Sequence, residues 1–138
     1  MIKLLSIIFP AKCPYCSNLI RAGQTECDSC REKLFSDPIL RRLSSGEYCT
    51  APWKYHSPAG QAIKDMKFRD HVFNTESLSK HLSRAVVMMY ATEKLDVVTS
   101  VPMYKASKRE RGYNQAEKLA RSVAKIINKP YNELLVKT

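Results

Sequence analysis

The sequence of 138 residues has no long apolar run, no pair of adjacent acidic residues, only four glycines and only three histidines. No apolar stretch approaches the roughly 18 residues that cross a bilayer, so no transmembrane helix is predicted. His56, His71 and His81 lack the spacing of a metal site, which favours surface positions or hydrogen-bonded core positions for them. Internal repeats and low-complexity tracts are also absent, so nothing indicates a repeat protein.

The first ten residues, Met1–Pro10, could be mistaken for a signal peptide. Their apolar core is short, however, and no small-residue cleavage site follows it. Lys12, immediately before Cys13, also argues against a lipoprotein site. We therefore expect a short helix or an extended arm that packs on the next module, and a cytoplasmic location. Contact of this arm with the inner face of a membrane is the alternative.

Positive charge is in clear excess. Lys and Arg number 23 against 13 Asp and Glu, which gives a formal net charge of +10. Such an excess favours phosphate-bearing partners, namely nucleic acid, phosphorylated sugars or anionic lipid, and a merely solvated basic surface is the alternative. The apolar fraction of 44% suffices for a core, and the length suits one compact domain with a small module.

Four of the five cysteines form two C-x-x-C pairs separated by ten residues: Cys13, Cys16, Cys27 and Cys30. Each pair makes a turn that points two thiolates toward one point, and two such turns supply the closed tetrahedral shell of a structural zinc site. A closed shell leaves no position for catalysis, and metal binding would fold a segment too short to have its own core. Disulfides or a redox pair are the alternatives. Cys49 stands alone and is predicted to be a small buried side chain.

Hydrophobic periodicity and turn residues predict the elements that follow the cysteines. In chain order these are a short helix over 31–42 that is broken near Pro38, one or two strands within 48–55, a helix from Pro58 to Met66 or Phe68 with Ser57 as its cap, a helix over 75–91, a strand over 95–101, a helix over 114–127 and a further candidate strand at 134–136. The run 95–101 is short and apolar, as in a buried parallel strand. Trp53 and Tyr55 suit core packing or stacking on bases, with core packing favoured.

The segment between the predicted strand at 95–101 and the helix at 114–127 carries the strongest signal of a binding site. Four cations, one glycine and the start of a capped helix converge there. Arginine forks, lysine charges and free helix N–H groups could neutralise a phosphodiester backbone or a pyrophosphate, and Gly112 permits a positive φ. The alternative is a solvated basic turn. The candidate phosphate- or nucleic-acid-binding residues are Lys105, Lys108, Arg109, Arg111, Gly112, Tyr113, Asn114 and Gln115.

Motifs in this segment resemble a known family. Val-Pro-Met at 101–103, Lys-Arg-Glu-Arg-Gly-Tyr-Asn-Gln-Ala-Glu at 108–117 and Leu-Ala at 119–120 are similar to the V-P-(l/m)…R-x-x-R-G-[FY]-N-Q-[AS]…L-A signature of the ComF family of competence proteins. The two C-x-x-C pairs fit that family's zinc ribbon, and Tyr55 with 63–68 fits its Y…I…lK[FY] segment. The resemblance runs from about Phe9 to the last residue. Lys105 or Lys108 stands near the position at which the family usually has the first arginine of this segment. A lysine keeps the positive charge there but not the bidentate geometry for phosphate.

The resemblance implies an α/β fold in which an N-terminal zinc ribbon with four cysteine ligands precedes an incomplete type I phosphoribosyltransferase-like domain. We expect residues 1–36 to form the arm and ribbon, 37–56 a β-rich connection and 57–138 the partial domain. The resemblance also implies natural transformation as the setting, with single-stranded DNA handled on the cytoplasmic side beside a membrane channel and an ATP-driven helicase. The candidate segment would then correspond to the family's pyrophosphate-binding loop.

Enzymatic activity is not expected from this sequence. The family's acidic pair and Thr-Thr-Gly loop, which would hold Mg²⁺ and phosphoribosyl pyrophosphate, lie downstream of R-G-Y-N-Q, and the sequence ends before any such motif. We therefore expect a C-terminally truncated chain with structural zinc, and Mg²⁺ and phosphoribosyl pyrophosphate only where the missing motif exists. The functions considered are an accessory protein of DNA uptake, a phosphoribosyltransferase and a zinc-dependent scaffold for protein interactions.

Overall fold

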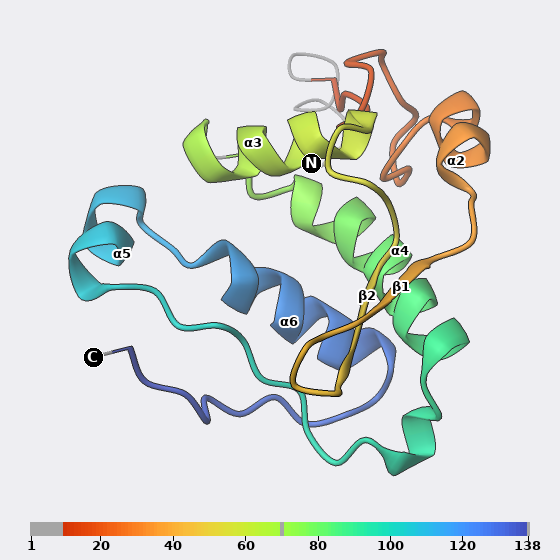
Figure 1. Ribbon diagram of the computed structural model, residues 1–138. Helices are drawn as coiled ribbons and strands as arrows, with labels where there is room; N and C mark the ends of the chain where they lie inside the picture. Colours follow the sequence, from red (N-terminus) through yellow and green to blue (C-terminus); the bar gives the residue numbers. More distant parts are fainter. Residues whose placement is uncertain (1–9, 70, 138) are drawn as a thin grey trace.

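The computed structural model describes residues 10–69 and 71–137. Helices and strands follow in the order α2 (Asp28–Leu34), β1 (Ile39–Arg42), β2 (Tyr48–Ala51), α3 (Pro58–Phe68), α4 (Asn74–Met89), the 3-10 turn η1 (Thr92–Lys94), α5 (Lys105–Arg111) and α6 (Gln115–Ile126) (Figure 1). The content is mixed α/β, as predicted. The N-terminal arm predicted over 1–10 lies outside the described residues, apart from Pro10.

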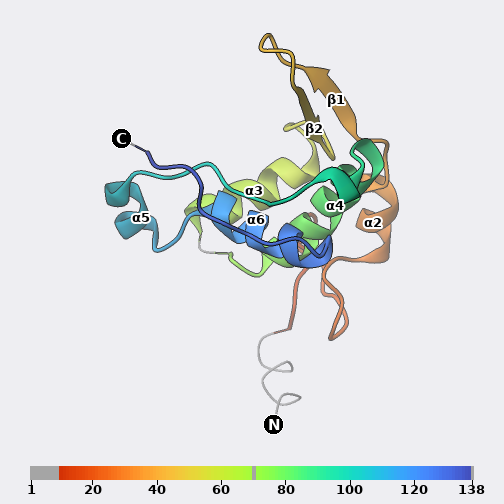
Figure 2. The same ribbon diagram turned by 90° about the horizontal axis from the view of Figure 1, so that it is seen from below.

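Helices α3, α4 and α6 form the body of the molecule (Figures 1 and 2). Buried polar side chains join them: the Asn74 side-chain amide donates to the Ala62 carbonyl over 3.1 Å, and the Ser79 and Ser122 hydroxyls lie 2.7 Å apart. The predicted helices at 58–68 and 75–91 are confirmed within one or two residues at each end. Ser57 occupies the predicted cap position of α3, although its side chain makes no capping hydrogen bond.

Strands β1 and β2 form an antiparallel hairpin that projects from one side of the helical body (Figure 2). The helix predicted over 31–42 is confirmed only in its first part, as α2, which ends at Leu34; for the residues after Pro38 the prediction is wrong, because they form β1 and pair with β2. The prediction that Cys49 is buried is wrong, because it sits on β2 of a sheet that has only two strands. A two-stranded sheet leaves much of its surface open to solvent.

The strand predicted over 95–101 is not formed as a regular element. Val98 makes one isolated parallel bridge to Tyr131, in which the Val98 N–H donates to Pro130 and its carbonyl accepts from Asn132. Buried parallel strands are stabilised by neighbours in a sheet and by helices on both faces. In the described part of the chain the only regular strands are those of the hairpin. The β-branched residues of 95–101 therefore remain extended without the repeated hydrogen bonds of a sheet. The predicted phosphoribosyltransferase-like sheet therefore stays a prediction.

One hydrophobic core joins the segment that carries the two C-x-x-C pairs (residues 13–30, the cysteine segment) to the helices. Its buried members are Cys13, Tyr15, Cys30, Leu34, Ala59, Ala62, Met66, Leu78 and Tyr113. Trp53 packs against this core, as predicted, and its indole N–H donates to the Leu34 carbonyl over 2.8 Å. Residues from the predicted segments 1–36 and 57–138 thus pack in the same interior.

Candidate functional site

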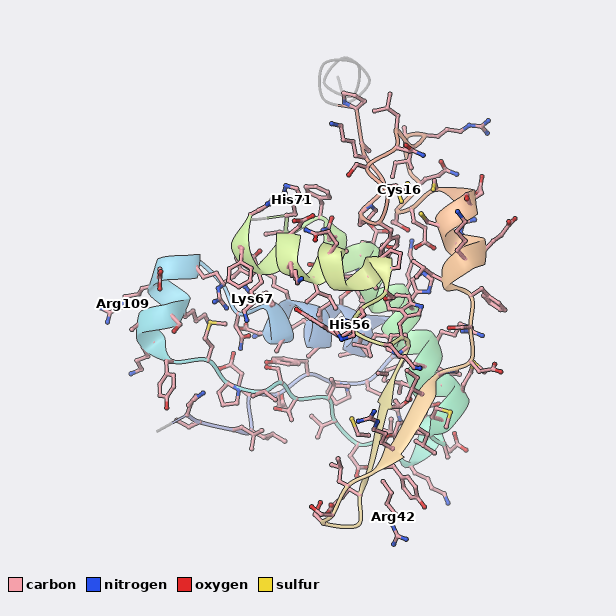
Figure 3. All side chains as sticks on the ribbon, turned by 45° about the horizontal axis from the view of Figure 1, so that its top comes forward. Cys16, Arg42, His56, Lys67, His71 and Arg109 are labelled. Carbon is pink, nitrogen blue, oxygen red and sulfur yellow. The ribbon has the colours of Figure 1, made fainter. Side chains whose placement is uncertain are left out.

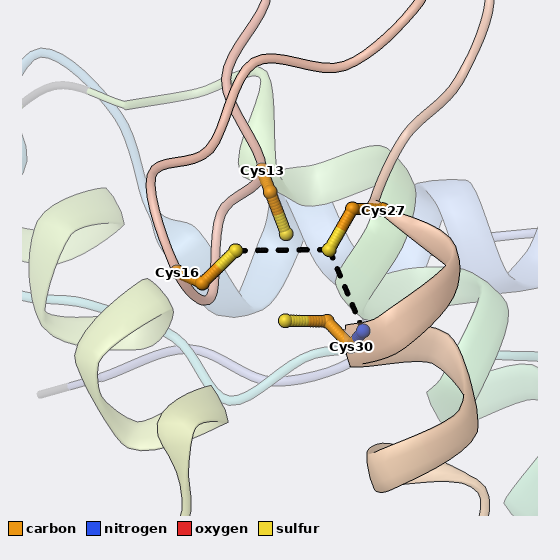
Figure 4. Close-up of side chains that lie close together, drawn as sticks. All are labelled: Cys13, Cys16, Cys27 and Cys30. Atoms are coloured by element: carbon orange, nitrogen blue, oxygen red, sulfur yellow. Dashed lines mark hydrogen bonds between the residues drawn. The ribbon is translucent and has the colours of Figure 1, made fainter.

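The four cysteines of the two C-x-x-C pairs meet at one point (Figure 4). Their sulfur atoms all lie within 4.8 Å of one another, so they could hold one metal ion. Cys27 caps α2, and its sulfur accepts the Cys30 backbone N–H over 3.4 Å. On the other side, Cys13 anchors a tight turn: its carbonyl accepts from the Ser17 N–H, and Ser17 has a φ of 63°. The predicted convergence of the cysteines is confirmed.

The spacing of the sulfurs suits tetrahedral zinc. With Zn–S bonds of about 2.3 Å, two sulfurs of a tetrahedron lie about 3.8 Å apart, and the Cys16 and Cys27 sulfurs are separated by 3.6 Å. Burial raises the pKa of Cys13, but nearby backbone N–H groups outweigh it and lower that pKa to about 7. Burial, and then the three other thiols, raise the pKa of Cys30. A bound divalent cation would offset the repulsion among four thiolates by its positive charge. The coordinated thiols would therefore be deprotonated.

A buried polar network fastens the cysteine segment to α4. The Glu26 carboxylate, only 5% exposed, accepts the Ser77 hydroxyl over 2.8 Å and lies 2.8 Å from the His81 Nε2 atom. The Tyr15 hydroxyl lies 2.7 Å from the Ser77 oxygen, and burial raises the Tyr15 pKa. The Arg31 guanidinium is 3.5 Å from the other Glu26 oxygen. His81 therefore has the satisfied core position predicted for it. Neither Glu26 nor Ser77 was marked by any sequence motif.

The segment expected to be a loop is in part a helix. Residues 105–111 form α5, since Lys, Ala, Arg and Glu favour helix and Gly112 ends it with a left-handed φ of 81°. The positive φ predicted as an option for Gly112 is thus confirmed. Lys105 and Arg109 are exposed and form no ion pair within the described ranges. Lys108 instead lies 3.0 Å from Glu117, which raises the Lys108 pKa and lowers the Glu117 pKa.

Three of the remaining candidates hold the segment in place. Asn114 caps α6 by accepting the Ala116 N–H over 3.0 Å, and its amide donates to the Val101 carbonyl over 3.0 Å. Tyr113 is buried, and its hydroxyl donates to the Met66 carbonyl of α3. The Gln115 side-chain oxygen accepts from the Arg111 guanidinium over 3.1 Å.

The structure also brings cations of α3 next to α5. A cleft of about 410 Å³ lies between the C-terminal ends of these two helices; it is lined by Lys67, Phe68, Arg69, Glu110, Arg111 and Tyr113. Figure 3 labels Lys67 in the region between α3 and α5, and Arg109 on the outer side of α5. The candidate cations therefore separate into two groups. Arg111 shares the cleft with α3, whereas Lys105, Lys108 and Arg109 border an open hollow with Gly112.

Comparison with known proteins adds no assignment. No family model matches the sequence, and no curated protein or solved structure matches it. The resemblance to the ComF family accordingly rests on the motifs quoted above. Within residues 10–69 and 71–137, none of the helices has the length and apolar character required to cross a membrane.

Proposed function

We propose that this chain is a ComF-like accessory protein of DNA uptake, which binds the phosphates of single-stranded DNA on a scaffold stabilised by zinc. The observation that carries the proposal is the cluster of cations on α5 and at the end of α3, which we call the basic surface. It has two parts: Lys67, Arg69 and Arg111 line the cleft between the two helices, and Lys105 and Arg109 border the hollow with Gly112. Clustered cations attract a polyanion by long-range electrostatics and by releasing its counterions.

The exposure of Lys105 and Arg109 supports phosphate binding. Neither forms an ion pair with a described carboxylate, so binding a phosphate would break no existing salt bridge of theirs. Lys108 differs, because Glu117 already neutralises it. Glu117 in turn also binds Arg121 at 3.0 Å. We therefore assign the main phosphate contacts to Lys105 and Arg109 and a smaller part to Lys108.

Zinc is proposed to be structural. Four thiolates fill a tetrahedral shell and leave no open position for a substrate or an activated water molecule. When bound, the ion would cross-link two turns that are separated by ten residues, through Cys13 and Cys16 on one side and Cys27 and Cys30 on the other. The cysteine segment then presents Glu26 to Ser77 and His81 of α4. In this proposal the metal supports the basic surface from a distance and does not touch DNA.

The residues of the basic surface do not fit Mg²⁺. Magnesium prefers several oxygen ligands, whereas the described residues that line the cleft between α3 and α5 offer one carboxylate, that of Glu110, beside three cations. We therefore propose no phosphoribosyl transfer and no Mg²⁺-pyrophosphate site for this chain. A competence helicase and a membrane channel remain the partners suggested by the family resemblance.

The test compares two double variants of equal charge. Lys105→Gln with Arg109→Gln removes two cations from α5, and Lys33→Gln with Arg41→Gln removes one Lys and one Arg from α2 and β1. The elements α2 and α5 lie at opposite ends of the molecule in Figures 1 and 2. The α5 variant should bind a short oligothymidylate more weakly, and its plot of log affinity against log salt should be flatter by about 1.4. The α2/β1 variant should keep nearly the slope of the unmodified protein. Equal slopes for the two variants would contradict the proposal.

A further inference from the structure

Phe68 is an exposed aromatic ring beside the cleft between α3 and α5. It is the last residue of α3, and 70% of it is accessible to solvent. The hydrogen bond from Tyr113 to Met66 holds the end of α3 against the chain that follows α5. Phe68 therefore lies next to Arg111, the last residue of α5, although 43 positions separate them in sequence.

Two cations lie beside this ring. The Lys67 ammonium lies 5.1 Å from the ring centroid, and the Arg111 guanidinium carbon lies 5.8 Å from it. Arg69 lines the same cleft; its exposed guanidinium lies 3.5 Å from the Asp65 carboxylate. Among the described residues, Lys67 thus forms no ion pair and Arg69 forms only this long one, so both can turn to a phosphate. Among the described residues of the lining, the three cations outnumber the one carboxylate, that of Glu110.

An exposed ring among cations suits an unpaired base that is attached to phosphates. An exposed cation–π contact improves an equilibrium by about two- to five-fold, whereas stacking of a base on an aromatic side chain improves binding by about 5- to 150-fold. A base can therefore displace Lys67 or Arg111 from the ring. The displaced cation is then free to contact the neighbouring phosphate. Duplex DNA cannot use the ring in this way, because its bases are already stacked inside the helix.

We propose that Phe68 is a stacking platform for one unpaired base, with the flanking phosphates bound by Lys67, Arg69 and Arg111. This inference rests on the proposed binding of single-stranded DNA and specifies what the site recognises: a base together with its backbone. Phosphates without bases, including free pyrophosphate, would use the cations and gain nothing from the ring.

The experiment uses Phe68→Leu in the full chain loaded with zinc. Leucine keeps an apolar side chain and changes no charge, and the ring is too exposed to support the core. Phe35→Leu is the matched control, because Phe35 is also exposed and also carries a guanidinium, that of Arg84, 4.0 Å from its ring. Phe35 follows α2, at the opposite end of the molecule from α5 (Figure 1). Each protein is titrated with an oligothymidylate and with an abasic strand of the same length, over a range of salt concentrations.

Phe68→Leu should weaken binding of the oligothymidylate by about 5- to 150-fold with an unchanged salt slope, and should leave binding of the abasic strand unaltered. Phe35→Leu should match the unmodified protein on both strands. Salt-dependent binding that Phe68→Leu leaves intact on both strands would overturn this inference alone. If the unmodified protein does not bind the oligothymidylate, or binds it independently of salt, the proposed function fails and the stacking platform fails with it.

Discussion

Replacing Ser77 by alanine should destabilise the protein far more than the same change at Ser83. Both serines lie on α4, and they are 1% and 2% exposed. The Ser77 hydroxyl donates to the Glu26 carboxylate and contacts the Tyr15 hydroxyl, whereas the Ser83 hydroxyl has no hydrogen-bond partner among the described residues. A buried hydrogen bond to a charged group contributes about 1.5–3 kcal/mol and a neutral one about 1 kcal/mol. Ser77→Ala should therefore cost about 3 kcal/mol, and Ser83→Ala should be neutral or slightly stabilising.

The assay is urea unfolding, followed by circular dichroism at a fixed excess of zinc. The zinc concentration must be the same for both variants, because a ligand that binds only the folded state adds to its stability. For a protein of this size, about 3 kcal/mol corresponds to a midpoint lower by about 1–2 M urea. Equal midpoints for Ser77→Ala and Ser83→Ala would show that the Glu26 network does not fasten the cysteine segment to α4.

Three further outcomes are expected. A methyl group built on Gly60 would lie 2.0 Å from the Tyr55 carbonyl oxygen, so Gly60→Ala should cost about 1–3 kcal/mol in thermal unfolding; an unchanged melting temperature would contradict this close approach. Asn114→Ala should lower the free energy of unfolding in urea by about 1–2 kcal/mol, because it removes both the capping hydrogen bond from Ala116 and the hydrogen bond to Val101. A decrease below about 0.5 kcal/mol would argue against the cap. A strong chelator should abolish much of the near-ultraviolet circular dichroism, because the proposed structural zinc would fold the cysteine segment. A spectrum that survives metal removal would show that the core alone suffices.

Local signals in the sequence predicted most of the helices and the cluster of four cysteines. The C-x-x-C spacing constrains where two thiols point, so the meeting of Cys13, Cys16, Cys27 and Cys30 followed from turn geometry. Ser57 before Pro58 marked the start of α3, and Asn114 marked the start of α6. Each of these signals depends on residues that are close in sequence.

The parts that were mispredicted or missed depend on distant partners. The β-branched run 95–101 favours a strand, but a strand needs neighbours, and Val98 makes only one bridge. Glu26 and His81 are 55 positions apart, and no local pattern pairs them. Phe68 looked like the end of an amphipathic helix; its place beside Arg111 follows from how α3 and α5 pack.

The most direct test of the account is the salt dependence of single-stranded DNA binding by the unmodified, zinc-loaded chain. With about 0.7 added to the slope by each phosphate contact, five contacts predict a fall in affinity of about 100-fold between about 50 and 200 mM salt. The five proposed contacts are Lys67, Arg69, Lys105, Arg109 and Arg111. An affinity that changes by less than about two-fold over this range would contradict phosphate binding by this surface.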